Sequence, residues 1–212
     1  MVRPSVDTAV ILEAAADVLA RHGPTRTTME EIAARAGVAK GVLYLRFRGK
    51  EALLRAVIDR EMGLALDVTR EAVATDPRGG LPSRLFAHSL KAMHDRPFLV
   101  SLYQGSRPPG GFGGDGPALH RSHGVLDVDF LRELSEAGML RADIDASALA
   151  VNLAVWNVGL AATAPHGDVD ALILSMGTLV ARSADADVED TDPGKECFAR
   201  LADRLAETWG HR

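Results

Sequence analysis

The sequence predicts an all-α protein: an N-terminal three-helix domain of the helix-turn-helix type, followed by an all-helical domain. Apolar residues recur at helical spacing through most of the chain, whereas runs of alternating β-branched or aromatic residues, typical of strands, are absent from it. Stretches rich in glycine, proline and aspartate separate the periodic segments. Hydrophobic residues make up 47% of the 212 residues, which is enough for a substantial core.

Three helices are expected at the N-terminal end. The first covers about 7–22 and is ended by Gly23-Pro24, because glycine accepts a left-handed cap and proline cannot continue the helix. The second opens at Thr28, the first residue of the capping-box sequence T-M-E-E. The third is short and covers about 39–47.

A longer fourth helix begins near Lys50 and runs to about residue 75, where 76–80 (D-P-R-G-G) break it. We expect two domains: residues 1–52, called the head below, and residues 53–212, called the body. The helices expected in the body after the fourth span 82–95, 98–105, 118–138, 145–163, 168–184 and 194–209.

Charge is distributed unevenly between the two ends of the chain. Residues 1–62 carry 10 Lys and Arg against 8 Asp and Glu, whereas the remaining residues carry 14 against 21. A mildly basic N-terminal part on an acidic remainder is the asymmetry expected if only the head meets nucleic-acid phosphates.

The sequence indicates a cytoplasmic protein without a membrane partner. Residues 1–7 contain no apolar run that could act as a signal peptide. The longest uncharged stretch, 146–165, includes two asparagines and several alanines, and it reads as a buried helix rather than a membrane span. The one cysteine, Cys197, excludes an internal disulfide and fits a reducing compartment.

The stretch from Thr28 to Phe47, TMEEIAARAGVAKGVLYLRF, has the spacing of a helix-turn-helix. Ala33 supplies the small residue where two helices cross, Gly37 a residue that tolerates positive φ in the turn, and Leu43 the apolar anchor of the second helix. The outer surface of that second helix then fits the DNA major groove, while the first helix crosses the backbone.

The same stretch resembles the N-terminal signature of the tetracycline-repressor (TetR) family. The resemblance covers about residues 8–58, and the body matches that family only in architecture. The residues that carry it are Thr28, Met29, Ile32, Ala33, Ala36, Gly37, Val38, Lys40, Gly41, Leu43, Tyr44, Phe47, Lys50, Glu51 and Leu53.

The resemblance implies a set of polar DNA contacts. Thr28 would bind phosphate through its hydroxyl or through neighbouring backbone amides. Lys40 and Tyr44 would contact phosphate or base edges, and Lys50 would hold another phosphate at the start of the fourth helix. Arg46 is either a further phosphate contact or a solvated surface arginine.

The resemblance also implies apolar contacts, and two positions depart from the family pattern. Gly41 would let the backbone approach DNA closely, and Val42 would pack on a thymine methyl group. Ala39 stands where a Ser or Thr usually caps the recognition helix, so that cap is missing. Leu45 stands where a polar residue often faces DNA, and it either contacts a thymine methyl or packs inward.

The resemblance further implies a homodimer whose body binds a small molecule. The dimer surface would come from 145–163 and 168–184, which are rich in Ala, Leu, Val and Gly; alternatively, those faces belong to the core of one subunit. The scarcity of charge in these helices favours a hydrophobic or weakly polar ligand. Candidate pocket residues are Phe86, Met93, Phe98, Tyr103, Phe112, Asn152 and Trp156.

Other motifs do not support a cofactor, a metal or catalysis. Residues 111–116 spell GxGxxG, but no strand is expected before them, so a nucleotide loop is not predicted. His120 and His123 are three residues apart and are expected on an exposed helix face rather than at a metal. The chain lacks local signatures of a nucleophile and its base, such as GxSxG or HExxH, so we expect no enzyme.

Together these observations predict a ligand-responsive transcriptional repressor. As a dimer, it would bind a palindromic or pseudopalindromic DNA operator and release it on binding a small hydrophobic molecule. Two alternatives remain: a DNA-binding regulator without small-molecule input, and a helical protein-interaction module.

Overall fold

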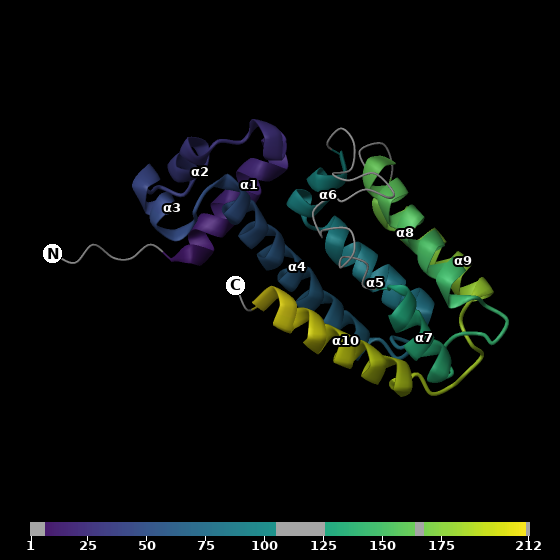
Figure 1. Ribbon diagram of the computed structural model, residues 1–212. Coiled ribbons are helices and arrows are strands. Elements are labelled where there is room, and N and C mark those ends of the chain that lie inside the picture. Colours follow the sequence, from purple (N-terminus) through teal and green to yellow (C-terminus); the bar gives the residue numbers. More distant parts are fainter. Residues whose placement is uncertain (1–6, 105–125, 164–167, 211–212) are drawn as a thin grey trace.

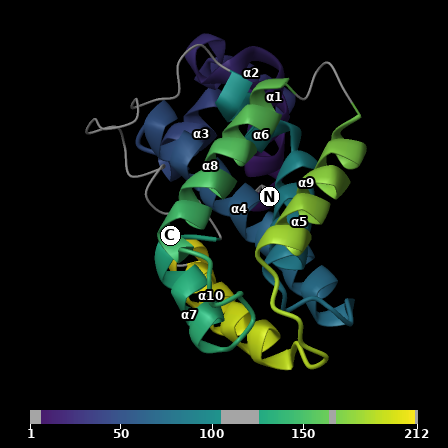
Figure 2. The ribbon, with the colours of Figure 1, turned by 90° about the vertical axis from the view of Figure 1, so that its right-hand side faces the viewer.

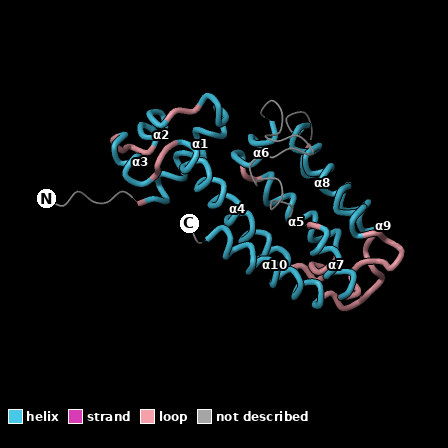
Figure 3. Tube along the Cα trace, viewed as in Figure 1, coloured by secondary structure: helices cyan, strands magenta, loops and turns pink. Residues whose placement is uncertain are grey.

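The computed structural model describes residues 7–104, 126–163 and 168–210, whose helices are arranged as in Figure 1. These residues form helices joined by loops, and none of them lies in a strand (Figure 3), which confirms the all-α prediction. Among the described residues, no helix combines the length and apolar composition needed to cross a bilayer. The helices are α1 (Thr8–Arg26), α2 (Met29–Arg35), α3 (Lys40–Arg46), α4 (Lys50–Thr75), α5 (Pro82–His94), α6 (Pro97–Gln104), α7 (Val128–Glu136), α8 (Ala146–Thr163), α9 (Val169–Ser183) and α10 (Asp192–Gly210).

Helices α1, α2 and α3 lie together at one end of the molecule (Figure 1). At the start of α2, the Thr28 hydroxyl accepts a hydrogen bond from the Glu31 amide at 3.2 Å, and the Thr28 amide donates to the Glu31 carboxylate at 2.8 Å. Gly37 has a φ of +68° in the turn before α3, a conformation that strains other residues. Leu43 is fully buried. The capping box, turn glycine and buried anchor of the predicted motif are therefore confirmed.

Two helix boundaries differ from the sequence prediction by more than two residues. Gly23 breaks α1 as expected, with a φ of +71°, but a further helical turn follows it and reaches Arg26. Helix α7 begins at Val128, because the carboxylate of Asp127 accepts a hydrogen bond from the Phe130 amide and caps the helix. The earlier part of that predicted helix, 118–125, lies outside the described residues.

Helix α4, 26 residues long, connects the head to the body. Leu53 and Val57 are buried near its start, where it packs on α1. Met62 and Leu66 are buried further along, where α5 and α10 pack against it, and α10 runs beside it in Figure 1. The helix continues through residue 52, so the division of the chain at that point stays a prediction.

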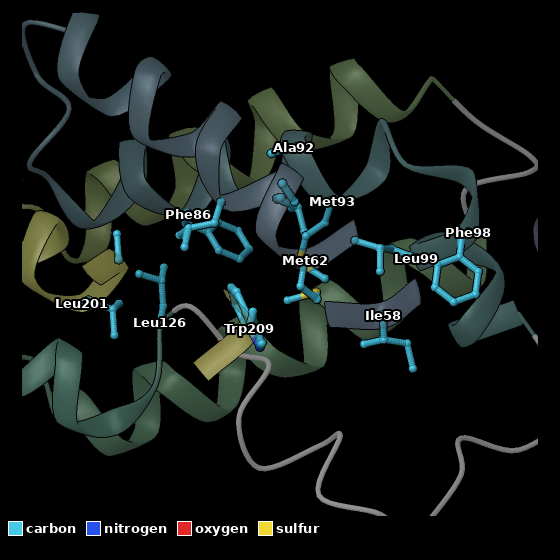
Figure 4. Packing of buried hydrophobic residues seen from close by; sticks show 14 of the residues in the cluster. Ile58, Met62, Phe86, Ala92, Met93, Phe98, Leu99, Leu126, Leu201 and Trp209 are labelled. Atoms are coloured by element: carbon cyan, nitrogen blue, oxygen red, sulfur yellow. The ribbon is translucent and has the colours of Figure 1, made fainter. Parts of the chain in front are cut away.

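The remaining helices build the body around an apolar interior. Helix α5 packs between α4 and α9, whereas α8 packs on α6 and α7, and α6 also packs on α1. Phe86 and Met93 of α5 gather with Met62 of α4 and Trp209 of α10 around the same part of the interior (Figure 4). Helices α8 and α9 both lie on the outer face that is turned toward the viewer in Figure 2.

Candidate DNA-binding interface

Helix α3 lies at the outer edge of the head, on the side away from the body (Figure 1). Leu43 and Phe47 are buried and fix its inner face. Gly41, Tyr44 and Leu45 are exposed, and the exposed fraction of Leu45 is 88%. Inward packing of Leu45, one of the two alternatives left by the sequence, is therefore wrong.

Lys40 and Tyr44 form a polar stripe along α3. The Lys40 ammonium lies 5.6 Å from the centroid of the Tyr44 ring and donates a hydrogen bond to the Glu30 carboxylate of α2. This hydrogen bond lowers the pKa of Glu30 and raises the pKa of Lys40. Lys40 thus presents a permanent positive charge on an exposed surface, but in the DNA-free protein a carboxylate already binds it.

Further cations lie at the C-terminal end of α3. Arg46 is exposed and donates a hydrogen bond to the Thr8 hydroxyl of α1. Arg48 is exposed just after the helix, and the Lys50 ammonium is 3.3 Å from the Thr25 carbonyl oxygen. A phosphate near this end of α3 would therefore meet several positive charges from one short segment.

Thr28 and Val42, two of the predicted DNA contacts, already interact with other groups of the protein. The hydroxyl and amide of Thr28 both bind Glu31, and these hydrogen bonds lower the pKa of the Glu31 carboxyl. A phosphate contact by Thr28 would have to replace part of that capping box, so it stays a prediction. Val42 is half-buried and packs against the core. Ala39 makes no side-chain cap, as its sequence implies.

The structure brings together some of the predicted pocket residues. Phe86, Met93 and Phe98 are buried in one core, and the Trp156 ring lies 6.3 Å from the Phe86 ring, centroid to centroid. Asn152, by contrast, is exposed on α8, where its amide donates to the Ala148 carbonyl oxygen. The expectation that Asn152 lies in an interior pocket is not met within this subunit, because its side chain is in solvent.

Two other residues of that list lie beyond the described structure: the whole of Phe112 and the side chain of Tyr103. Ser89, which was not predicted, shares the inner face of α5 with Phe86 and Met93. Its hydroxyl oxygen is buried and has no hydrogen-bond partner among the described residues. A polar residue on an apolar helical stripe was the sequence signal that could have identified it.

An ion pair that sequence reasoning also missed joins α4 to the segment before α6. The Glu61 carboxylate, in a side chain that is only 7% exposed, accepts hydrogen bonds from Arg60 and, at 3.1 Å, from Arg96. Glu61 falls on the apolar stripe of α4 between Val57 and Ala65, and a carboxylate at such a position indicates a buried partner.

The outer faces of α8 and α9 carry large apolar side chains in solvent. Helix α8 exposes Val151, Val155 and Val158, which lie on one helical face, and α9 exposes Leu172, Leu174 and Leu179. The exposed fraction of Leu174 is 69%. On α9, Leu172 and Leu179 share one helical face, whereas Leu174 lies on the opposite side. Monomeric proteins rarely leave large apolar side chains together on one exposed face, so the valine face of α8 points to a protein contact.

The described residues contain no group of three or more His, Cys, Asp or Glu side chains placed to hold a metal ion. His120, His123 and the glycine-rich segment 111–116 lie outside them.

Comparison with known proteins places the head in a characterised sequence family. The profile described as "Bacterial regulatory proteins, tetR family" matches residues 11–57. The HTH-type transcriptional regulator YerO of Bacillus subtilis is 28% identical over 97 residues, which are 43% of this chain and 33% of that protein. The fatty acid metabolism regulator protein of the same organism is 35% identical over 63 residues, 30% of this chain and 32% of that protein. The matched stretch thus spans about a third of each relative.

Most of the chain shares the fold of a solved protein. The structure of the transcriptional regulator FadR from Bacillus subtilis in complex with stearoyl-CoA superposes with a TM-score of 0.64 over 82% of this chain and 97% of that chain, at 20% identity. This likeness extends the shared fold from the head through the body. Residues 11–57, which include the helix-turn-helix of α2 and α3, therefore carry the sequence motif of the tetR family of bacterial regulatory proteins.

Proposed function

We propose that this protein is a cytoplasmic, ligand-responsive transcriptional repressor. Two copies would bind an operator with two related half-sites, each through α3, and a small hydrophobic molecule in the body would release them. The head (1–52) would be the DNA-binding domain and the body (53–212) the effector and dimerisation domain. The observation that carries this proposal is the outward surface of α3, where Gly41, Tyr44 and Leu45 are exposed above a buried Leu43.

Electrostatics support DNA as the partner of this surface. Lys40 lies at the N-terminal end of α3, and Arg46, Arg48 and Lys50 lie at or just beyond its C-terminal end. Cations at both ends of a helix that enters the major groove can bind the phosphates on either side of the groove. Each such contact releases counterions, so the affinity should fall steeply as salt rises.

Pairing of two copies is supported by α8 and α9. Both helices expose valines or leucines. The helices themselves lie on the outside of the body (Figure 2), away from α3 (Figure 1). A dimer formed there as a four-helix arrangement would leave both recognition helices free for DNA. A palindromic operator follows from the twofold symmetry of such a dimer.

The interior of the body supports an apolar effector. Phe86, Met93 and Trp156 provide aromatic and flexible apolar surface, and the Ser89 hydroxyl offers a hydrogen bond that no described residue uses. The structurally similar FadR was solved with stearoyl-CoA, a ligand with a long alkyl chain. Helix α4 would transmit the effect, because it packs on α1 in the head and on α5 in the body.

Selection of bound sequences from random DNA duplexes tests the proposal. We expect an inverted repeat to be enriched by the wild-type protein and not by the variant carrying both Lys40→Ala and Tyr44→Ala, whose substitutions are exposed and leave the core intact. Stearoyl-CoA and oleic acid are then titrated into the complex, and at least one should release the DNA. Enrichment without release by either compound would favour a regulator without small-molecule input; no enrichment would favour a protein-interaction module.

A further inference from the structure

Leu45 has the most exposed large apolar side chain among the described residues, at 88%. It lies on the second-last position of α3, between the polar Tyr44 and Arg46. A leucine this exposed contributes little to the packing of its own subunit, although burying such a side chain is favourable by about 1.5–3 kcal/mol. Its apolar surface is therefore available to a partner.

Helix α3 presents Leu45 in an unusually open setting. Gly41 lies one turn earlier on the same face, and helical side chains lean toward the N-terminus, so the leucine lies over a position without a side chain. A Cβ atom at Gly41 would meet nothing within 4 Å. Gly41 and Leu45 thus form a shallow apolar stripe that can approach a flat surface closely.

This apolar stripe runs beside the polar stripe of Lys40 and Tyr44. Lys40 and Tyr44 have the charge and hydrogen-bonding groups that phosphates and base edges attract, whereas Leu45 can form no hydrogen bond with either. In the major groove, the main apolar group on a base edge is the C5-methyl of thymine. Val42, the other apolar candidate, is half-buried against the core and presents less surface.

From this placement we propose that Leu45 determines sequence specificity by contacting the C5-methyl group of one thymine in each half-site. The inference rests on the proposed function, since it assigns a role within the DNA contact of α3. The inference adds a requirement that DNA binding alone does not impose. The operator must have an A·T pair at the position facing Leu45, which is recognised by shape and apolar contact.

Replacement of thymine by deoxyuridine tests this directly, because it removes only the methyl group. In the selected operator, each thymine is replaced in turn, at symmetric positions in both half-sites, and affinity is measured for the wild-type protein and Leu45→Ala. We expect one position at which the replacement weakens wild-type binding by about fourfold for each half-site, as for the loss of one buried methyl group. The Leu45→Ala variant should bind both duplexes equally.

Val10→Ala is the matched control, since it shortens an exposed apolar side chain of the head that lies on α1, outside α3. It should keep the wild-type response to deoxyuridine at the Leu45 position. The inference is overturned if no thymine shows a methyl effect, or if Leu45→Ala retains it, while the wild-type protein still binds its operator. If neither protein binds any duplex selectively, the proposed function is overturned as well.

Discussion

Lys40 and Glu30 show how single residues tune a binding surface. The ammonium that would bind phosphate is already bound by a carboxylate of the preceding helix, and both side chains are exposed. A phosphate at Lys40 would therefore compete with the Glu30 carboxylate for the ammonium, and it would lie close to the Glu30 charge. Glu30 should weaken binding in general and make the protein more selective for operators with many favourable contacts.

The substitution Glu30→Gln should raise affinity for the operator by severalfold at low salt, because it frees Lys40 and removes a negative charge from the interface. The gain should shrink as salt rises, since both charges are exposed to solvent. Fluorescence anisotropy across a salt series measures this. Glu13→Gln, at an exposed site on α1, changes the net charge equally and should have a smaller effect.

His94 predicts a pH dependence of stability. Burial lowers the pKa of its imidazole, more than the neighbouring Leu90 carbonyl and Asp95 raise it. The pKa of His94 is therefore lower in the folded protein than in the unfolded chain. As the pH falls below about 6.5, the unfolded chain binds a proton at this residue before the folded protein does, so the free energy of unfolding decreases. Urea unfolding at pH 7.5 and pH 5.5 should show a smaller loss for His94→Gln than for wild type.

The corresponding variant of the exposed His22 provides the control for this effect. His22→Gln should retain the wild-type loss of stability between the two pH values. Equal losses in wild type and His94→Gln would show that other groups dominate the acid response.

At the level of whole elements, local signals in the sequence placed the helices of the head and most of those of the body, but they did not decide which face of each body helix is buried. Thr28, Gly37 and Leu43 have roles set by their own turn or helix, so spacing alone identified them. The direction of Asn152 depends on how α8 sits on its neighbours, and the helix is apolar on nearly every side, so periodicity could not orient it. Leu45 remained ambiguous for a related reason, since leucine suits either face of a short helix.

The ion pair between α4 and the start of α6 gives a prediction for these elements. Replacing Arg96 with Met leaves the buried Glu61 carboxylate with Arg60 as its only described cation, which should reduce the free energy of unfolding by about 1–3 kcal/mol. Adding Glu61→Met should restore much of the loss, because no buried charge then remains. A urea-denaturation double-mutant cycle measures both effects, and purely additive losses would contradict the proposed coupling.

At the scale of the whole molecule, the pairing of subunits is the property that is hardest to predict from amino-acid composition. The sequence left two readings for the apolar helices near residues 145–184, a subunit interface or a subunit core. In the structure each helix has a buried side and an exposed side: Leu153 and Ile173 are buried, whereas Val155 and Leu174 are exposed. Which side of such a helix meets its own core depends on contacts with distant segments, and no local pattern records them.

Substitution of Val155 with Lys should therefore disrupt the proposed dimer without unfolding the subunit. We expect analytical ultracentrifugation to show a monomer, with wild-type helical circular dichroism and at least tenfold weaker operator binding, because pairing of two heads is lost. Val68→Lys is a matched control: Val68 of α4 and Val155 have the same exposed fraction, 49%. The control should remain dimeric, and a dimeric Val155→Lys would contradict the interface proposed on α8 and α9.

The central claim is that α3 of each subunit binds one half of a symmetric operator. The most direct measurement compares, by fluorescence anisotropy over a salt series, the selected operator with a duplex in which one half-site is scrambled. We predict that scrambling weakens binding by at least tenfold and that affinity for the intact operator falls steeply as salt rises. Equal affinity for the two duplexes, or binding that salt leaves unchanged, would contradict the account.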